Sequence, residues 1–159
     1  MAWVGQEPAG LEDRRAMLKR WEQEWAAGGD VALGVFVEGQ VAGSCGLHRR
    51  IGSHGLEIGY WIHPAYTRQG LATATARTLT EAAFSVPGID HVEIHHDRAN
   101  QASAGIPRKL GFAFVGEVQD EVAAPGEVGV EWIWRMDRIA WHSVGPGPPD
   151  LGICPSGSP

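Results

Sequence analysis

The chain has 159 residues, 43% of them hydrophobic, and a formal net charge of −6 at pH 7. We expect one globular domain with a substantial core, and no apolar run approaches the ~20 residues of a membrane helix. The negative charge argues against nucleic acid as a partner. Two cysteines, Cys45 and Cys154, make no disulfide framework, and the first residues do not resemble a signal peptide, so a cytoplasmic location is the simplest expectation.

A helix and a hairpin are expected in the first third of the chain. The helix covers residues 8–27 and ends at Gly28-Gly29, and we expect its tryptophans, Trp21 and Trp25, to pack into the core. Strands 31–37 and 40–48 form the hairpin around a turn at Glu38-Gly39.

The other expected elements are organised around the strand expected at residues 56–63. By alternation, one face carries Leu56, Ile58, Tyr60 and Ile62, and the other carries Glu57, Gly59, Trp61 and His63. Pro64 cannot donate to a strand ladder and should end the strand.

A glycine-bearing turn at residues 67–73 then leads into a helix that ends near Phe84. The first amides of a helix lack internal partners and lie at the positive end of its dipole, so the turn suits a pyrophosphate. An ordinary strand-to-helix turn is the alternative. The turn lacks the three glycines of a dinucleotide fingerprint and the Gly-Lys-Ser/Thr of a P-loop.

The second half continues with a strand at residues 91–96 and a helix capped by Asn100 and ended by Gly111. Strands 112–118 and 130–136 form a second hairpin. Its long acidic loop, with Asp120, Glu121 and Glu127, is solvated surface or a substrate-facing rim. The domain is expected over residues 1–138, and the segment 139–159, rich in glycine, proline and serine, is expected to be a disordered tail.

Three motifs in this order and spacing resemble the GNAT acetyltransferase superfamily, in particular its RimJ/RimL-like N-acetyltransferases, over residues 11–137. The motifs are Leu56-Glu57-Ile58-Gly59-Tyr60-Trp61, Gly70-Leu71-Ala72-Thr73, and Asn100-Gln101-Ala102-Ser103 with Lys109-Leu110-Gly111-Phe112. The resemblance implies an α/β (α+β) fold with a mixed, mostly antiparallel central sheet and helices on both faces.

The sequence departs from the family pattern at two positions. Thr67 stands where the acetyl-CoA loop usually has glutamine or arginine, and Arg68, one residue along, can supply the charge. Pro107 stands where many relatives have a tyrosine acid, so the resemblance points to Ser103 as the proton donor.

The resemblance implies acetyl-CoA as co-substrate, no metal, and direct acetyl transfer to a primary amine in a ternary complex. A base must deprotonate the amine, and Glu57 is the candidate, with His63 as an alternative; Glu57 is otherwise a glutamate on a wet sheet face. Backbone amides near the thioester are expected from Ile62 and His63. Asn100 would hold the pantetheine arm, unless it and Ser103 only cap their helix. The remaining cofactor-binding residues expected are Arg68, Gln69, Gly70, Leu71, Ala72 and Thr73.

Several alternatives stay open at this stage. His95 and His96 are adjacent on a strand, point to opposite faces and do not readily share a metal. The usual first strand and helix of the family have no counterpart here, which would leave the edge of strand 31–37 bare and allow a homodimer. The chain could also be a non-catalytic acyl-CoA-binding module or a purely structural domain. The acceptor could be a ribosomal-protein N-terminus, a lysine, a polyamine, an amino acid or an amine antibiotic.

Overall fold

The computed structural model describes residues 10–144. Six strands in this part of the chain form one sheet in the order β1-β2-β3-β4-β6-β5. In chain order, the helices and strands are α1 (Leu11–Ala26), β1 (Val31–Val37), β2 (Gln40–His48), β3 (Gly55–Ile62), a short 3-10 helix (Pro64–Tyr66), α2 (Leu71–Ser85), β4 (His91–Asp97), α3 (Gln101–Leu110), β5 (Ala113–Gln119), β6 (Val130–Asp137) and α4 (Arg138–Val144).

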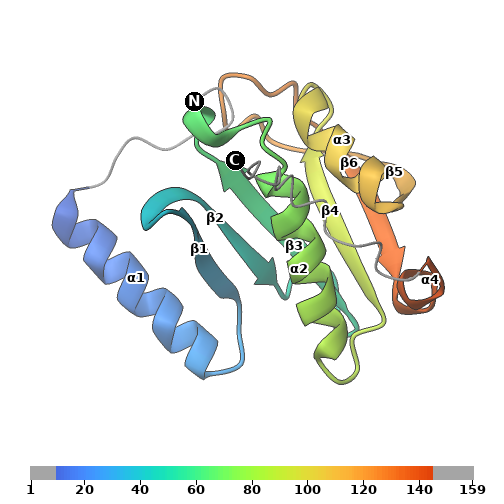
Figure 1. Cartoon of the computed structure of the whole chain (residues 1–159), viewed down its shortest axis with the longest axis horizontal. Coiled ribbons are helices and arrows are strands. Elements are labelled where there is room, and N and C mark those ends of the chain that lie inside the picture. Colours follow the sequence, from blue (N-terminus) through green and yellow to red (C-terminus); the bar gives the residue numbers. More distant parts are fainter. Residues whose placement is uncertain (1–9, 145–159) are drawn as a thin grey trace, which may run out of the picture.

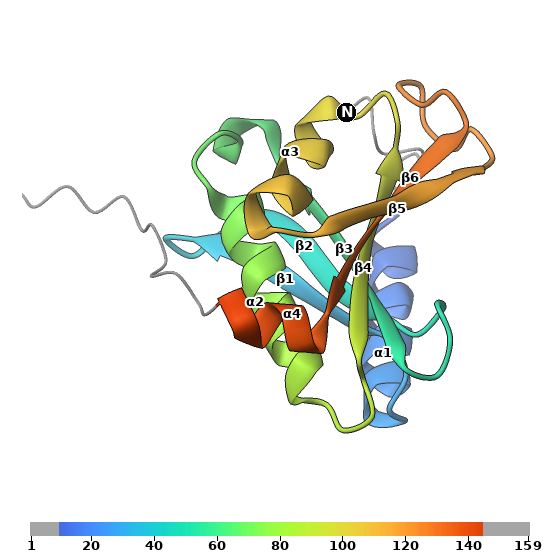
Figure 2. The same ribbon diagram turned by 90° about the vertical axis from the view of Figure 1, so that its right-hand side faces the viewer.

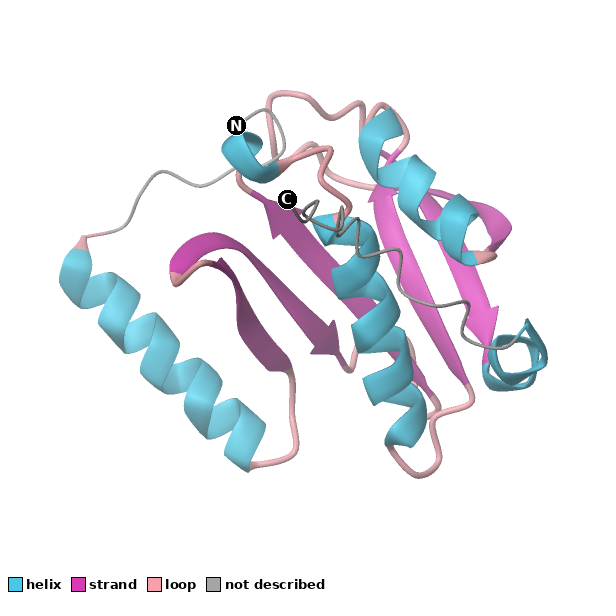
Figure 3. Ribbon diagram, in the orientation of Figure 1, coloured by secondary structure: helices cyan, strands magenta, loops and turns pink. Residues whose placement is uncertain are grey.

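The sheet is mixed and mostly antiparallel, as expected. Among the described strands, only β3 and β4 pair in parallel. The helix α1 lies beside β1 on one face of the sheet, and α2, α3 and α4 lie on the other (Figures 1 and 2). Figure 3 shows the cyan helix α2 crossing in front of the magenta central strands. The expected α/β class, with helices on both faces, is confirmed.

The core lies between α2 and the central strands. The face of α2 that carries Leu79, Ala83 and Phe84 packs against Ile58 of β3 and Ile94 of β4, and each of these side chains is at most 4% exposed. The alternation predicted for the central strand holds on this face, because Leu56 and Ile58 are buried. This packing holds β3 and β4 beneath the first turn of α2, where the candidate site lies.

The first hairpin has the boundaries that the sequence predicted. Glu38 and Gly39 both have positive φ, 48° and 77°, as a two-residue turn between twisted strands requires. The second hairpin, β5 and β6, is also antiparallel.

Two expectations were wrong. Within the described residues no side chain of α1 is buried, and Trp25 is 57% exposed, because α1 packs mainly on the edge strand β1. The segment 139–144, assigned to a disordered tail, is helical: Trp141 packs against Phe84, with ring centroids 6.5 Å apart. Arg138 anchors this helix by donating to the backbone carbonyls of Phe84, Val86 and Ile89. Residues 1–9 and 145–159 of the expected domain and tail lie outside the described part.

Candidate active site

The strands β3 and β4 separate after a short paired stretch. Gly55–Glu57 pairs with His91–Glu93, but β3 continues to Ile62 and β4 to Asp97 without further pairing between them. The opening forms part of a cavity of about 910 Å³, whose walls also include the first turns of α2 and α3. The backbone groups that face this opening have no partner strand there, so the cavity has hydrogen-bonding walls.

The first turn of α2 borders the cavity. Gly70 precedes the helix with φ 81°, and no atom beyond its two neighbouring residues lies within 4 Å of where its Cβ would be. The Ala74 amide donates the first hydrogen bond of the helix, to the Gly70 carbonyl. The amides of Leu71, Ala72 and Thr73 precede it and have no acceptor within the helix. Arg68 lines the same region and also has positive φ, 63°. This turn offers amides and one cation to an anion, which fits a pyrophosphate.

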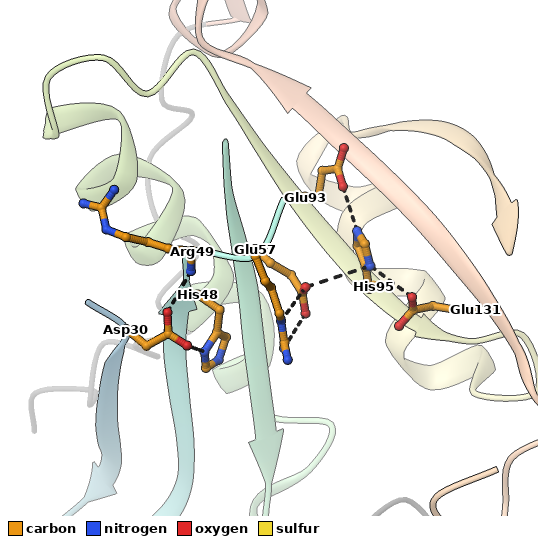
Figure 4. A network of polar contacts seen from close by, with 8 residues as sticks. Asp30, His48, Arg49, Glu57, Glu93, His95 and Glu131 are labelled. Atoms are coloured by element: carbon orange, nitrogen blue, oxygen red, sulfur yellow. Dashed lines mark hydrogen bonds and ion pairs between the residues drawn. The ribbon is translucent and has the colours of Figure 1, made fainter. Parts of the chain in front are cut away.

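Glu57 lies at the point where β3 and β4 separate, and it is 9% exposed. The Nε and Nη2 atoms of Arg50 donate to its two carboxylate oxygens at 2.8 and 2.7 Å. His95 Nδ1 is 4.0 Å from Glu57 Oε2 (Figure 4). Glu57 is therefore a buried, ion-paired carboxylate, and the alternative of a glutamate on a wet sheet face is wrong.

His95 connects Glu57 to a second group of carboxylates. Its Nε2 donates to Glu93 at 2.7 Å and its Nδ1 to Glu131 at 3.1 Å, as Figure 4 shows. Burial lowers the pKa of His95, but the hydrogen bonds with Glu131 and Glu93 outweigh it and raise the pKa to about 9. His95 is therefore an imidazolium at neutral pH. Arg135 holds the other oxygen of Glu93 with donors at 2.6 and 2.8 Å.

His96 points to the opposite face, as the sequence predicted. Its Nε2 accepts a hydrogen bond from Trp134 Nε1 at 3.0 Å, and its Nδ1 donates to the Asp97 carbonyl. Burial lowers the pKa of His96, so it is a neutral core residue. No group of His, Cys, Asp and Glu between residues 10 and 144 is arranged to hold a metal ion.

Asn100 and Ser103 lie at the first turn of α3 and line the cavity. Asn100 Oδ1 accepts a hydrogen bond from the Ser103 amide at 3.1 Å, so Asn100 is the N-cap that the sequence predicted. The side chain of Ser103 is half-buried beside Tyr60 of β3. Pro107, inside α3, is fully buried, which leaves this helix without a phenol at that position.

The two expected amide donors, Ile62 and His63, point in opposite directions from the backbone at the end of β3. The His63 amide donates to the Ala42 carbonyl at 2.7 Å, and His63 Nδ1 accepts from the Ala65 amide at 3.2 Å. The His63 amide is therefore used within the sheet, and His63 is not among the residues that line the cavity. Because successive amides of a strand alternate in direction, those of Tyr60 and Ile62 point away from β2, toward the opening.

Nine of the expected site residues lie together around the cavity, and two do not. Those that line it are Glu57, Ile62, Arg68, Gly70, Leu71, Ala72, Thr73, Asn100 and Ser103. His63 and Gln69 are not among its walls, and Gln69 Nε2 donates back to the Ala65 carbonyl at 3.2 Å.

Sequence reasoning missed Tyr60, His95 and Glu131. In the parallel register Glu57 pairs with Glu93. His95, two residues further along β4, therefore lies on the same face of the sheet as Glu57.

Solved acetyltransferases share this fold. A probable acetyltransferase superposes with a TM-score of 0.78 at 24% identity, over 86% of this chain and 78% of that one. A RimL ribosomal L7/L12 alpha-N-protein acetyltransferase in complex with coenzyme A superposes with a TM-score of 0.73 at 19% identity, over 83% and 75%. This chain therefore shares its fold with these two solved structures.

The family follows from the sequence comparison. Residues 1–113 match the model of the acetyltransferase (GNAT) domain, and the chain belongs to this family. The putative ribosomal N-acetyltransferase YdaF of Bacillus subtilis (strain 168) is 27% identical over 114 residues, 71% of this chain and 62% of that protein. The spermidine N(1)-acetyltransferase of Escherichia coli (strain K12) is 32% identical over 81 residues, 51% of this chain and 41% of that protein. The matches thus span less than two thirds of both relatives.

Proposed function

We propose that this protein is an acetyl-CoA-dependent N-acetyltransferase that transfers the acetyl group directly to a primary amine. The observation that supports it most is the opening between β3 and β4, which carries anion-binding amides at one end and a buried carboxylate at the other. Membership of the GNAT family supports the same reaction.

The cofactor residues divide into two groups. The amides of Leu71, Ala72 and Thr73, with Arg68, hold the pyrophosphate, and the side-chain amide of Asn100 reaches the pantetheine arm. The amides of Tyr60 and Ile62 donate to the carbonyl oxygen that gains negative charge. Acetyl-CoA itself supplies an activated acetyl group on sulfur.

Glu57 is the proposed base that takes the proton from the amine. Its burial and its place at the end of the opening support this role. Arg50 occupies both of its oxygens, but the Arg50 side chain is 61% exposed. An ion pair with one solvent-exposed partner is weak, so Arg50 can move aside when a cationic amine arrives.

We propose a cationic acceptor, since the carboxylates that line the cavity outnumber its cationic side chains. Asp97, Asp120, Glu121, Glu127 and Glu131 all line it, in favour of the acidic loop as a substrate-facing rim. Most of them also have a structural role: Asp97, Asp120 and Glu127 accept backbone hydrogen bonds, and Glu131 is bonded to His95. A protein N-terminus and a polyamine both fit, in line with the names of the two relatives.

Thermal melting with acetyl-CoA, with ATP as control, tests the binding half of the proposal. A ligand at ~100 times its Kd that binds only the folded state adds about 2.7 kcal/mol of stability. A shift with acetyl-CoA alone, followed by turnover with a panel of peptide N-termini and polyamines, supports the enzyme. No shift, for a folded protein, overturns it.

The second candidate is an acyl-CoA-binding module without turnover. The Arg50–Glu57 ion pair favours it, because a carboxylate held on both oxygens does not accept a proton from an amine. A melting shift with acetyl-CoA, without turnover of any amine in the panel, would select this candidate.

We also propose a homodimer and a cytoplasmic location. β1 is an edge strand, and Leu33 and Phe36 on it are 40% and 61% exposed, which supports pairing with a second copy. Cys45 is a free thiol, which suits a reducing compartment.

A further inference from the structure

The hydroxyl of Tyr60 is a buried polar group without a hydrogen bond. Its oxygen is shielded from solvent and has no partner among the described residues. A buried polar group is unfavourable when it is left unpaired, and native proteins contain few of them. The chain has only two tyrosines, so this unpaired phenol stands out.

The position of Tyr60 connects this hydroxyl to the proposed reaction. Tyr60 lies on β3 past the last residue paired with β4, and it lines the same cavity as Asn100 and Ser103. Ser103 is close enough to lower the pKa of the Tyr60 phenol, but not in hydrogen-bonding geometry; burial has the larger effect and raises that pKa. The phenol thus keeps its proton at any physiological pH, as a proton donor must.

Resting on the proposed function, we propose that the Tyr60 hydroxyl donates the proton that the departing sulfur needs, with Ser103 as its positioning residue. The amine nitrogen bonds to the carbonyl carbon, the C–S bond breaks, and its electron pair leaves on sulfur. Tyr60 gives its proton to that sulfur. The ammonium nitrogen loses two protons in becoming the amide: Glu57 takes the first before the attack, and water takes the second from the nitrogen once the N–C bond has formed. Water then returns one proton to the phenol, and Glu57 releases its proton to solvent, so one proton is released overall and charge balances.

This assignment gives the unpaired hydroxyl a partner. Pro107 stands inside α3 at the position where the family resemblance implies a tyrosine acid, and Tyr60 brings a phenol into the same cavity from β3. The sulfur of the bound cofactor would then take the place of the missing hydrogen-bond partner of the Tyr60 hydroxyl. Cofactor binding would remove the destabilisation that the unpaired hydroxyl causes in the free protein. A purely structural tyrosine would have its hydroxyl paired or in solvent.

The test compares Tyr60→Phe with the parent. We expect turnover to fall about 100-fold, the KM for acetyl-CoA to stay within about threefold, and the melting temperature without ligand to stay equal or rise, since the variant removes an unpaired hydroxyl. Thr80→Val is the matched control. It removes a buried hydroxyl that does donate, to Ala76 at 2.7 Å on α2, away from the cavity, and its turnover should stay within about twofold.

Two further measurements test the assignment, and the first of them does not depend on turnover. In a Tyr66→Phe background Tyr60 is the only phenol, and its ultraviolet tyrosinate signal should not appear until the protein unfolds in alkali. A phenol that titrates near pH 10, like a free tyrosine, overturns the assignment. For Ser103→Ala combined with Tyr60→Phe, we expect turnover no lower than for Tyr60→Phe alone, since the two act as one unit.

The outcomes separate the two claims. An active parent and an equally active Tyr60→Phe variant overturn the role of Tyr60 and leave the proposed function intact. A variant that melts several degrees lower and loses acetyl-CoA binding shows that the hydroxyl is structural, which also overturns it. A parent that turns over no amine in the panel overturns both.

Discussion

Arg50 and Glu57 form a two-point ion pair, with Nε 2.8 Å from Oε2 and Nη2 2.7 Å from Oε1. The two partners differ in burial: the side chain of Glu57 is 11% exposed and that of Arg50 is 61% exposed. The arginine therefore covers the carboxylate from the solvent side. An amine that reaches Glu57 must displace it.

Glu57→Gln tests the base. The amide has nearly the same shape but does not take a proton, so we expect turnover to fall roughly 10²- to 10³-fold at neutral pH. The melting shift given by acetyl-CoA should be unchanged, because Glu57 is not part of the proposed pyrophosphate site at the first turn of α2. Steady-state kinetics and melting together check this, and turnover equal to the parent would remove Glu57 from the mechanism.

His95 should make stability depend on alkaline pH. Its pKa is about 9 in the folded protein and about 6.5 when unfolded. The stabilisation is therefore complete below pH 6.5 and is lost as pH rises through 9, by up to roughly 3 kcal/mol. Urea unfolding of the parent and His95→Gln at pH 6.5 and 9.5 measures it. A variant with the parent's full decrease would show that other groups cause it.

Gly70→Ala should weaken acetyl-CoA binding at the first turn of α2. Gly70 and Gly88 have nearly the same left-handed φ, 81° and 82°, and open space around the missing Cβ. Alanine at either position costs about 1 kcal/mol of stability. Only Gly70→Ala should also reduce the melting shift with acetyl-CoA, because only Gly70 lines the cavity. Equal ligand shifts in both variants would argue against an anion site at this turn.

A chain cut after residue 138 should be less stable than one cut after residue 144. The shorter chain loses Trp141, which packs on Phe84, and removal of a partly buried tryptophan costs roughly 2–4 kcal/mol. Urea unfolding of the two truncated forms measures the difference. Equal stabilities would restore the expectation that residues 139–144 are tail.

The edge strand β1 should support a dimer in solution. Leu33→Lys places a charge on the exposed part of this edge, which natural sheets use to prevent pairing. We expect light scattering at micromolar concentration to give a dimer for the parent and a monomer for the variant. A monomeric parent at all concentrations tested would refute the dimer.

The sequence predicted the elements better than it predicted the site. Alternation along β4 separated His95 from His96, and Glu38-Gly39 defined a hairpin, because both depend on local geometry. The ion pair of Glu57 was missed because Arg50 lies in a loop, whose path local patterns do not determine. The exposed face of α1 was missed for a related reason: an apolar stripe indicates that a helix can be buried, but not whether the sheet reaches it.

The strand order implies a particular sequence of events during synthesis on the ribosome. β6 lies between β4 and β5 although it is made after both, so one side of the central strand β4 stays without a neighbour until residues 130–137 have emerged. The carbonyls of Phe84, Val86 and Ile89 likewise lack the hydrogen bonds from Arg138 until residue 138 has been made. The growing chain therefore keeps this sheet edge open while residues 98–129 are made, and it is during this period that a chaperone has the unpaired side of β4 to bind.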